Sequence, residues 1–166
     1  MHWASKMLLL AALGVGLSGV AHAQGPPPDP THVHFTLPAD IQWTGGSGIG
    51  VYEARLFGDP SKPGPYGILV KWMPGNFSHP HFHSQDRWVY VVSGTWWVSS
   101  STHFDPSQTY PLPAGTFATD LANTVHWDGA KAGGEPAVLE LVGMGPVTTI
   151  EVDENGKPLP PRSANR

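Results

Sequence analysis

Histidines at alternate positions are the first feature of this sequence that could carry chemistry. The segment His79-Pro80-His81-Phe82-His83 places three of them two residues apart. In an extended strand, side chains at i and i+2 leave the same face about 6–7 Å apart. Two imidazoles with that spacing can bind one metal ion through nitrogens about 2.1 Å from it. His32-Val33-His34 has the same spacing within a Pro-rich stretch, so spacing alone does not define a site.

A third ligand must come from a distant part of the chain, and His126 is the candidate because it follows a turn-rich segment. Three neutral imidazoles leave positions on the ion free for a small molecule, as in catalytic metal sites. His79 is left out of the ligand set. His103 lies in the polar segment Ser99–Gln108, where a solvated histidine is expected.

The residues around the His pair follow a longer pattern. Gly75, five residues, His81-Phe82-His83, three residues, Arg87, six residues and Gly94 stand in that order. This spacing resembles the first cupin motif, in which a Glu occupies the position of Arg87. The resemblance implies a small β-barrel with one divalent metal ion inside, held by two His and the Glu of this motif and by a His of a second motif.

The second motif is recognisable further along the chain. Gly115, five residues, Leu121-Ala122-Asn123, two residues and His126 match its spacing. Asn123 replaces the usual Gly, and Asn is among the non-Gly residues that best tolerate a positive φ. Leu121 replaces a Pro, and the Asn that ends the motif would fall at Ala130. The chain resembles an exported subgroup of small single-domain cupins with the RmlC-like jelly roll, a subgroup without an established function.

Arg87 is the most informative departure from the motif. A guanidinium about 6–7 Å from a divalent cation would repel it by about 5 kcal/mol at an effective dielectric constant of 20. A carboxylate inside the barrel could neutralise it, with Glu140 as the candidate. An anionic substrate could instead bridge the ion and Arg87, which would then be a substrate-binding residue for a small carboxylic acid. In a third arrangement the three His bind a ligand by hydrogen bonds and no ion is held. A register shift would offer Asp86 or Gln85 as a fourth ligand.

The elements that must position these residues are short strands. Runs of β type separated by Gly- and Pro-rich turns cover Val51–Phe57, Tyr66–Met73, Asn76–His83, Arg87–Ser99, Thr116–Leu121, Val125–Asp128, Ala137–Val142 and Val147–Val152. The turn at Ser93-Gly94 predicts a hairpin within Arg87–Ser99. The sequence sustains no helical period over three turns. The pattern predicts an all-β fold, and the motifs make it a cupin-type jelly-roll β-barrel.

The start of the chain is typical of a signal peptide. The apolar run Met7–Val20 is followed by Ala21-His22-Ala23, which predicts cleavage near Ala23 and a periplasmic or secreted protein. The run is shorter than the ~20 residues of a membrane-spanning helix, so no span is expected in the mature chain. The expected organisation is a signal peptide (1–23), a Pro-rich arm (24–40), the cupin barrel (41–152) and a C-terminal tail (153–166) that frays from Asn155.

The amino-acid composition limits the binding partners and the chemistry that the chain can have. Nine Lys and Arg stand against thirteen Asp and Glu, a net charge of −4 that becomes −5 without Lys6. Nucleic acid is an improbable partner for such a chain. The sequence contains no cysteine, which excludes thiolate chemistry and disulfides. The tryptophans near the site are expected in the core, in a homodimer interface or around an apolar ligand: Trp88, Trp96, Trp97 and Trp127.

Two functions fit these residues. The first is an exported enzyme that holds one divalent ion through His81, His83 and His126 and acts on a small molecule, for instance a carboxylate. The resemblance to three-His cupin dioxygenases implies oxidation if the ion is Fe, and Zn would favour hydrolase or lyase chemistry. The second is a non-catalytic periplasmic protein that binds a small ligand or a metal, with Arg87 replacing the Glu ligand. The ion is Zn, Cu, Mn or Fe, and acquisition outside the cytoplasm favours Cu and Zn.

Overall fold

A computed structural model describes residues 25–46 and 50–160 of the 166-residue chain. The predicted signal peptide, residues 1–23, lies outside the described residues. The chain divides into two units between Thr36 and Leu37. In the first unit, residues 25–36 are exposed and form no helix or strand. The second unit begins with the short 3₁₀ helix η1 (Pro38–Asp40) and contains every strand of the described residues.

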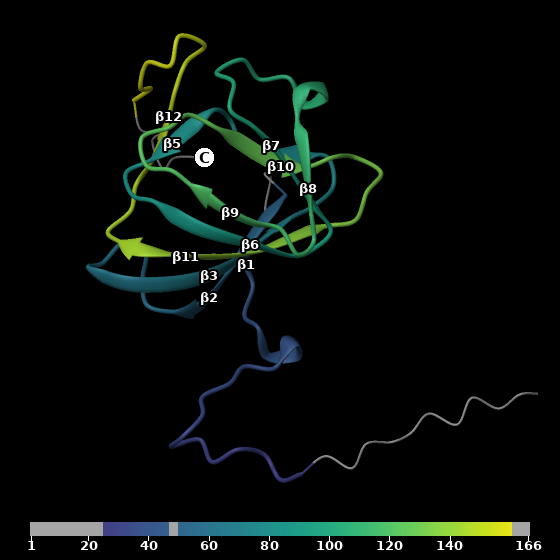
Figure 1. Ribbon diagram of the computed structural model, residues 1–166, viewed down its shortest axis with the longest axis vertical. Helices are drawn as coiled ribbons and strands as arrows, with labels where there is room; N and C mark the ends of the chain where they lie inside the picture. Colours follow the sequence, from purple (N-terminus) through teal and green to yellow (C-terminus); the bar gives the residue numbers. More distant parts are fainter. Residues whose placement is uncertain (1–24, 47–49, 161–166) are drawn as a thin grey trace, which may run out of the picture. The chain divides into compact units, whose positions relative to one another are not determined.

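Twelve short strands and a second 3₁₀ helix follow η1 in the described part of the chain (Figure 1). They are β1 (Thr44–Gly45), β2 (Val51–Phe57), β3 (Gly64–Trp72), β4 (Asn76–Phe77), β5 (His81–His83), β6 (Arg87–Ser93), β7 (Thr95–Ser99), η2 (Pro106–Gln108), β8 (Tyr110–Pro113), β9 (Phe117–Asp120), β10 (Trp127–Ala130), β11 (Ala137–Gly145) and β12 (Thr149–Glu151). The runs predicted from the sequence account for all of these strands except β1 and β8. The predicted all-β class is therefore confirmed.

The larger layer is a six-stranded antiparallel sheet in the order β1-β2-β3-β11-β6-β9. Its central strand, β11, pairs with β3 along its whole length and with β6 on the other side. Side chains alternate between the faces of such a sheet, so Leu139 and Leu141 of β11 point into the barrel while Glu140 points out. The buried core consists of Tyr66, Ile68, Val70, Trp72, Val89, Val91, Trp96, Ala130, Ala137, Leu139 and Leu141.

The second layer is built from β4-β10-β7-β8 together with the pair β12-β5. β4 pairs with β10, and the pairing resumes at β5, where His81 forms an isolated antiparallel bridge with His126. Trp96 and Ala130 bring this layer into the same core as the large sheet. Two antiparallel layers around one core make the predicted jelly-roll barrel.

The predicted hairpin at Ser93-Gly94 is wrong. β6 pairs with β11 and β9 in the large sheet, whereas β7 pairs with β10 and β8 in the other layer. The chain crosses between the layers at Gly94, whose φ is +71°. A Cβ at this position would lie 2.3 Å from the carbonyl oxygen of Pro136, so the crossing needs a glycine. The sequence marks the tight turn correctly but not the strands that it joins.

The chain was expected to fray from Asn155, but hydrogen bonds hold the described residues up to Pro160. Val152 and Pro158 form an isolated β-bridge, and the Leu159 backbone N–H donates to the carbonyl oxygen of Glu151 at 2.8 Å. The Thr102 hydroxyl donates to the carbonyl oxygen of Glu154 at 2.7 Å. These bonds attach the segment to β12, which pairs with β5, and to the loop after β7.

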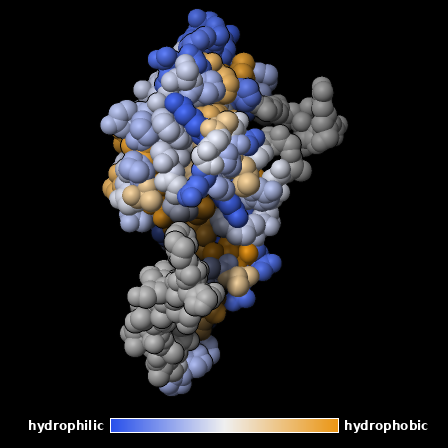
Figure 2. Space-filling model, turned by 90° about the vertical axis from the view of Figure 1, so that its right-hand side faces the viewer, coloured by the Kyte–Doolittle hydropathy of each residue, from blue (hydrophilic) through white to orange (hydrophobic). Residues whose placement is uncertain are grey.

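Among the large apolar side chains exposed on the described residues, four lie on two neighbouring strands of the large sheet. On the face drawn in Figure 2, hydrophilic residues dominate the end at the top, and hydrophobic residues form smaller patches lower down. Trp88, Tyr90 and Val92 of β6 and Phe117 of β9 are exposed, and Tyr90 is the register partner of Phe117. Among the described helices, none has the length and apolar composition to cross a membrane.

Candidate metal centre

Strand alternation turns two of the three predicted ligands into the barrel. In β5, His81 and His83 are 6% and 3% exposed, while Phe82 between them is only partly buried. Their Nε2 atoms are 3.0 Å apart. Two nitrogens that bind one ion at about 2.1 Å and at a right angle are also about 3.0 Å from each other. The spacing within β5 is therefore suited to two adjacent ligands of a single ion.

Backbone pairing brings the third histidine to the same place. The N–H of His81 donates to the carbonyl oxygen of His126, and the N–H of His126 donates to that of His81, both at 2.9 Å. The ring centroids of these two residues are 4.4 Å apart. Before His126, the turn contains Asn123 with φ +58°, and its N–H donates to the carbonyl oxygen of His83 at 2.8 Å. Asn123 thus takes the positive φ expected where the motif has Gly.

Hydrogen bonds at Nδ1 fix the orientation of two of the rings. Nδ1 of His81 lies 2.7 Å from the carbonyl oxygen of His79, and Nδ1 of His126 lies 3.4 Å from that of Thr124. A carbonyl oxygen only accepts, so in both rings Nδ1 carries the hydrogen and Nε2 keeps its lone pair. A second acceptor, Oδ1 of Asp120, lies 3.3 Å from Nδ1 of His126.

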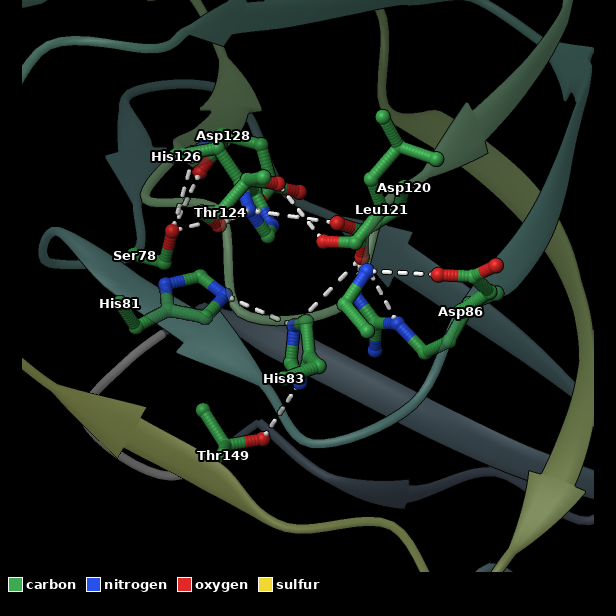
Figure 3. Close-up of polar contacts among 12 residues, drawn as sticks. Ser78, His81, His83, Asp86, Asp120, Leu121, Thr124, His126, Asp128 and Thr149 are labelled. Atoms are coloured by element: carbon green, nitrogen blue, oxygen red, sulfur yellow. Dashed lines mark hydrogen bonds and ion pairs between the residues drawn. The ribbon is translucent and has the colours of Figure 1, made fainter.

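His83 has an equivalent partner on the neighbouring strand. Its Nδ1 lies 3.0 Å from the hydroxyl oxygen of Thr149 in β12, a register partner of His83. The hydroxyl can accept a hydrogen bond from Nδ1, which directs the lone pair of Nε2 into the barrel (Figure 3). Partners at the second ring nitrogen are typical of metal-binding histidines, since they hold the tautomer and the ring in place.

The three rings can hold one metal ion. One ring nitrogen from each of His81, His83 and His126 lies within 4.8 Å of the other two. Nε2 of His126 is fully buried and has no hydrogen-bond partner among the described residues. A buried lone pair without a donor is costly, and a metal ion would satisfy it. The donor set and this orphaned nitrogen therefore fit a metal ion, and the three residues form the only group of this kind in the described part of the chain.

Burial keeps two of the rings uncharged. It lowers the pKa of His81, and the neighbouring His126 lowers it further. Burial also lowers the pKa of His83 strongly, with the positive charge of Arg87 as the next cause. Both rings are therefore neutral at pH 7, which is the state that binds a metal ion.

Arg87 opens β6 and points to Asp120, its register partner on β9. Nε and Nη2 of Arg87 donate to Oδ2 of Asp120 at 2.8 and 2.5 Å. The same Oδ2 lies 3.7 Å from Nε2 of His83. A carboxylate does neutralise the arginine, but it is not Glu140, which faces outward from β11. Asp120 comes from β9, and sequence reasoning missed it because only the strand register reveals that it faces Arg87.

The remaining candidates stand outside the three-His group. His79 stacks on Phe104 with ring centroids 5.6 Å apart. His103 is exposed, and its Nδ1 lies 3.6 Å from a carboxylate oxygen of Glu154. Gln85 and Asp86 are both exposed, and Asp86 accepts a hydrogen bond from the N–H of Ala122 at 2.7 Å. His32 and His34 are exposed residues of the first unit.

A cavity of about 620 Å³ opens beside the rings. His81, His83 and Arg87 contribute to its wall. The other lining residues are Val51, Glu53, Val70, Trp72, Gly75, Asn76, Phe77, Ser78, His79, Trp96, Phe104, Pro106, Asp128, Leu139, Leu141, Thr149 and Glu151. This volume lies in the range of small-molecule sites. Of the tryptophans expected near a ligand, Trp96 lines the cavity, Trp88 is exposed on the outside of β6, and Trp72 joins the lining without having been predicted.

The sequence matches no protein-family model and no curated protein. Solved structures do resemble the chain. The polyketide cyclase RemF from Streptomyces resistomycificus has a TM-score of 0.57 and 16% identity, over 75% of this chain and 89% of its own. KdgF from Halomonas sp. has a TM-score of 0.52 and 20% identity, over 68% and 94%.

An RmlC-like cupin protein from Ralstonia eutropha JMP134 has a TM-score of 0.57 and 18% identity, over 78% of this chain and 80% of its own. Further similar structures are also described as RmlC-like cupins or cupin 2 proteins. Identities of this size establish a shared fold and do not carry an activity. The two-layered barrel, its motif spacing and these likenesses together show that the chain has the cupin jelly-roll fold.

Proposed function

We propose that the protein holds one divalent metal ion through Nε2 of His81, His83 and His126, and acts with it on a small molecule in the adjoining cavity. The observation that carries this proposal is the buried Nε2 of His126, which has no hydrogen-bond partner among the described residues, in a ring that belongs to a group of three with one nitrogen each within 4.8 Å of the others. A catalytic metal site usually has three protein ligands, whereas a structural site has four.

The chain's own residues would prepare the site before any ion arrives. The carbonyl oxygen of His79, the hydroxyl of Thr149 and the carboxylate of Asp120 hold the three rings in place. Burial excludes water from the rings and keeps His81 and His83 neutral. When bound, the ion would supply Lewis-acid chemistry at an oxygen of the small molecule, or redox chemistry if it is Fe or Cu.

The fold supplies a precedent for small-molecule chemistry. One protein with this fold is a polyketide cyclase, which is an enzyme acting on an organic molecule. The cavity of about 620 Å³ supports the same kind of partner for this chain. The reaction of the present protein would depend on its metal, with Zn and Cu favoured over Mn and Fe if it is acquired outside the cytoplasm.

A binding protein without catalysis is the second candidate, and Arg87 favours it. The guanidinium stands where cupins carry a Glu ligand, and after burial its charge is the next cause of the lowered pKa of His83. A positive charge close to a metal site also weakens the binding of a cation by electrostatic repulsion. Asp120 offsets that charge by its contact with Nε and Nη2, which is why we prefer the metal-dependent function.

Metal content tests the proposal. Purified protein is expected to carry about one Zn, Cu, Mn or Fe per chain by elemental analysis, and metal-free protein to bind Zn²⁺ in calorimetry. His81→Ala and His126→Ala should each abolish this binding, because two imidazoles do not complete the site. His103→Ala is the matched control, since His103 is exposed and outside the group. Full metal occupancy in both site variants would refute the ligand assignment.

We also propose that the mature chain functions in the periplasm or in the medium. The apolar run and Ala21-His22-Ala23 support this location. N-terminal sequencing of protein from the periplasmic fraction should give a start near Gln24. Recovery of the full chain, with Met1, from the cytoplasm alone would exclude export.

A homodimer is proposed through the exposed apolar area of β6 and β9. Trp88, Tyr90 and Val92 and their neighbour Phe117 are between 43% and 65% exposed. A patch of large apolar side chains on adjacent strands is typical of an interaction surface. Light scattering should give twice the mass of the chain for the wild type and the single mass for Tyr90→Lys. A single mass for the wild type would exclude the dimer.

A further inference from the structure

Asp128 is a buried acidic residue that the metal site does not use. It lies on β10, two residues after His126, and is 8% exposed. Its Oδ2 accepts hydrogen bonds from the indole N–H groups of Trp72 at 3.0 Å and Trp96 at 2.7 Å. Its Oδ1 accepts one from the hydroxyl of Ser78 at 3.0 Å. These three donors belong to three different strands or loops, so they fix the carboxylate firmly.

The fixed carboxylate forms part of the cavity wall. Asp128, Ser78, Trp72 and Trp96 all line the same cavity as His81. A carboxylate has about four acceptor positions, and the three donors use three of them. A ligand in the cavity that carries a hydrogen-bond donor can therefore bond to Asp128.

The charges around the cavity disfavour an anionic ligand. Glu53, Asp128 and Glu151 line it, and its one Lys or Arg is Arg87. The guanidinium of Arg87 is already bound to Asp120 through Nε and Nη2. A small carboxylic acid, expected from the sequence on account of Arg87, would thus meet three acidic residues and an arginine whose charge is already balanced.

The rest of the wall selects for an apolar body. Aliphatic and aromatic side chains contribute a large share of it, among them Val70, Trp72, Trp96, Phe104, Leu139 and Leu141. Aromatic walls favour flat rings, which stack or pack edge to face against them. Small-molecule sites commonly combine such walls with a few fixed polar groups that orient the ligand.

We infer that the cavity takes an uncharged molecule with an aromatic or similarly apolar body and a hydroxyl group, and that Asp128 accepts the hydrogen bond of this hydroxyl. The inference rests on the proposed function in so far as the cavity is where the small molecule binds. It concerns residues that remain in place whether or not a metal ion is held.

Three probe molecules that share one ring system test separately the need for a hydroxyl donor and the effect of a negative charge. 2-Naphthalenemethanol is uncharged and has a hydroxyl donor, its methyl ether lacks the donor, and 2-naphthoate carries a negative charge at pH 7. Their binding to metal-free, ¹⁵N-labelled protein can be followed at the indole N–H signals of Trp72 and Trp96, assigned with Trp72→Phe and Trp96→Phe. These two groups contact Asp128 directly, so they report binding at this wall.

The alcohol should bind at least tenfold more tightly than 2-naphthoate and severalfold more tightly than the ether. Asp128→Asn keeps the shape of the side chain and should reduce the preference of alcohol over ether. Glu140→Gln is the matched control: Glu140 faces outward from β11 and does not line the cavity, so this change should leave that preference as it is. Equal binding of alcohol and ether, or tighter binding of 2-naphthoate, would overturn the inference.

The same titrations on Zn²⁺-treated protein separate this inference from the proposed function. If no metal binds while the metal-free protein prefers the alcohol, the metal proposal fails and the ligand class stands. If one Zn²⁺ binds through the histidines while the alcohol shows no preference in either form, the ligand class fails alone.

Discussion

Arg87 and Asp120 face each other as register partners on β6 and β9, and the guanidinium donates two hydrogen bonds to a single carboxylate oxygen. The side chain of Asp120 is only 4% exposed, and that of Arg87 is 16% exposed. Asp120 also lies 3.3 Å from Nδ1 of His126. One carboxylate therefore balances the charge of Arg87 and also orients His126. Asp120 thus offsets the arginine that stands where the motif has a Glu ligand.

The first prediction concerns this pair. Asp120→Asn leaves the charge of Arg87 unbalanced beside the rings, so the affinity for Zn²⁺ should fall by about 10–100-fold, the usual effect of losing such a partner. Arg87→Gln removes the repulsion and should raise the affinity. Calorimetric titration of metal-free protein with Zn²⁺ measures both changes.

The double variant decides whether the two residues act together. Asp120→Asn should cost clearly less affinity in an Arg87→Gln background than in the wild type, because the charge that Asp120 balances is gone. Arg55→Gln is the matched control, since Arg55 is in an exposed pair with Asp59 outside the site. Effects of the two single variants that simply add would show that Asp120 acts only through His126.

The second prediction concerns the partner of His83. Thr149→Val keeps the size of the side chain and removes the hydroxyl 3.0 Å from Nδ1 of His83. The ring would lose its orienting bond, so the affinity for Zn²⁺ should fall by about tenfold while the free energy of unfolding of the metal-free protein changes little. Thr148→Val, at the exposed position next to it, should change neither quantity. Wild-type affinity in Thr149→Val would mean that the ring needs no such partner.

A third prediction follows from the lowered pKa of His81 and of His83. In the unfolded chain both titrate near the usual pKa of about 6.5. Because the folded protein holds them neutral, the unfolded state binds more protons below that pH, and stability must fall as the pH falls. Between pH 7.5 and 5.5 the strongly lowered pKa of His83 should cost the metal-free protein about 1.4 kcal/mol of its free energy of unfolding, and the lowered pKa of His81 should add to this loss.

Urea unfolding at a series of pH values in the presence of a chelator checks this slope. His83→Gln should reduce this pH dependence of the free energy of unfolding, because burial lowers the pKa of His83 strongly in the folded protein. His103→Gln, at an exposed position, should leave the slope as it is. A stability that stays constant from pH 7.5 to 5.5 would mean that both rings take up protons inside the fold.

Much of this site could be predicted from sequence because its information is local. His81 and His83 are two residues apart, so the period of a strand alone puts them on one face. Asn123 could be expected to take a positive φ because few other side chains tolerate it. His126 was reachable through the spacing of the second motif, although only the backbone pairing with His81 shows why the two meet.

The partners of these residues could not be predicted in the same way. Glu140 has a carboxylate and lies on a central strand, but its parity on β11 sends it outward while Leu139 and Leu141 point in. Asp120 could be paired with Arg87 only once the register of β9 against β6 was known. Register depends on contacts between distant segments, which no spacing within one motif specifies.

At Gly94 the fold, too, depends on contacts between distant segments that local sequence does not specify. The last prediction concerns this residue. The turn signal at this position is local, but the strands on its two sides enter different layers because their apolar side chains face the core from opposite sheets. The backbone at Gly94 has φ +71°, and a Cβ at this position would lie 2.3 Å from the carbonyl oxygen of Pro136. Gly115 also has a positive φ, +90°, but no atom lies within 4 Å of its Cβ position.

Gly115→Ala should therefore lower the free energy of unfolding by about 1–2 kcal/mol, the cost of the left-handed backbone alone. Gly94→Ala adds a collision with backbone that cannot rotate away, and its cost should be larger, about 3 kcal/mol or more. Urea unfolding of the two variants, at equal pH and with chelator, measures the difference. Because both positions share the strain of positive φ, their difference isolates the close approach between the β6–β7 crossing and the start of β11. Equal losses in the two variants would mean that the chain near Pro136 moves aside, and that the crossing between the layers is not tightly packed.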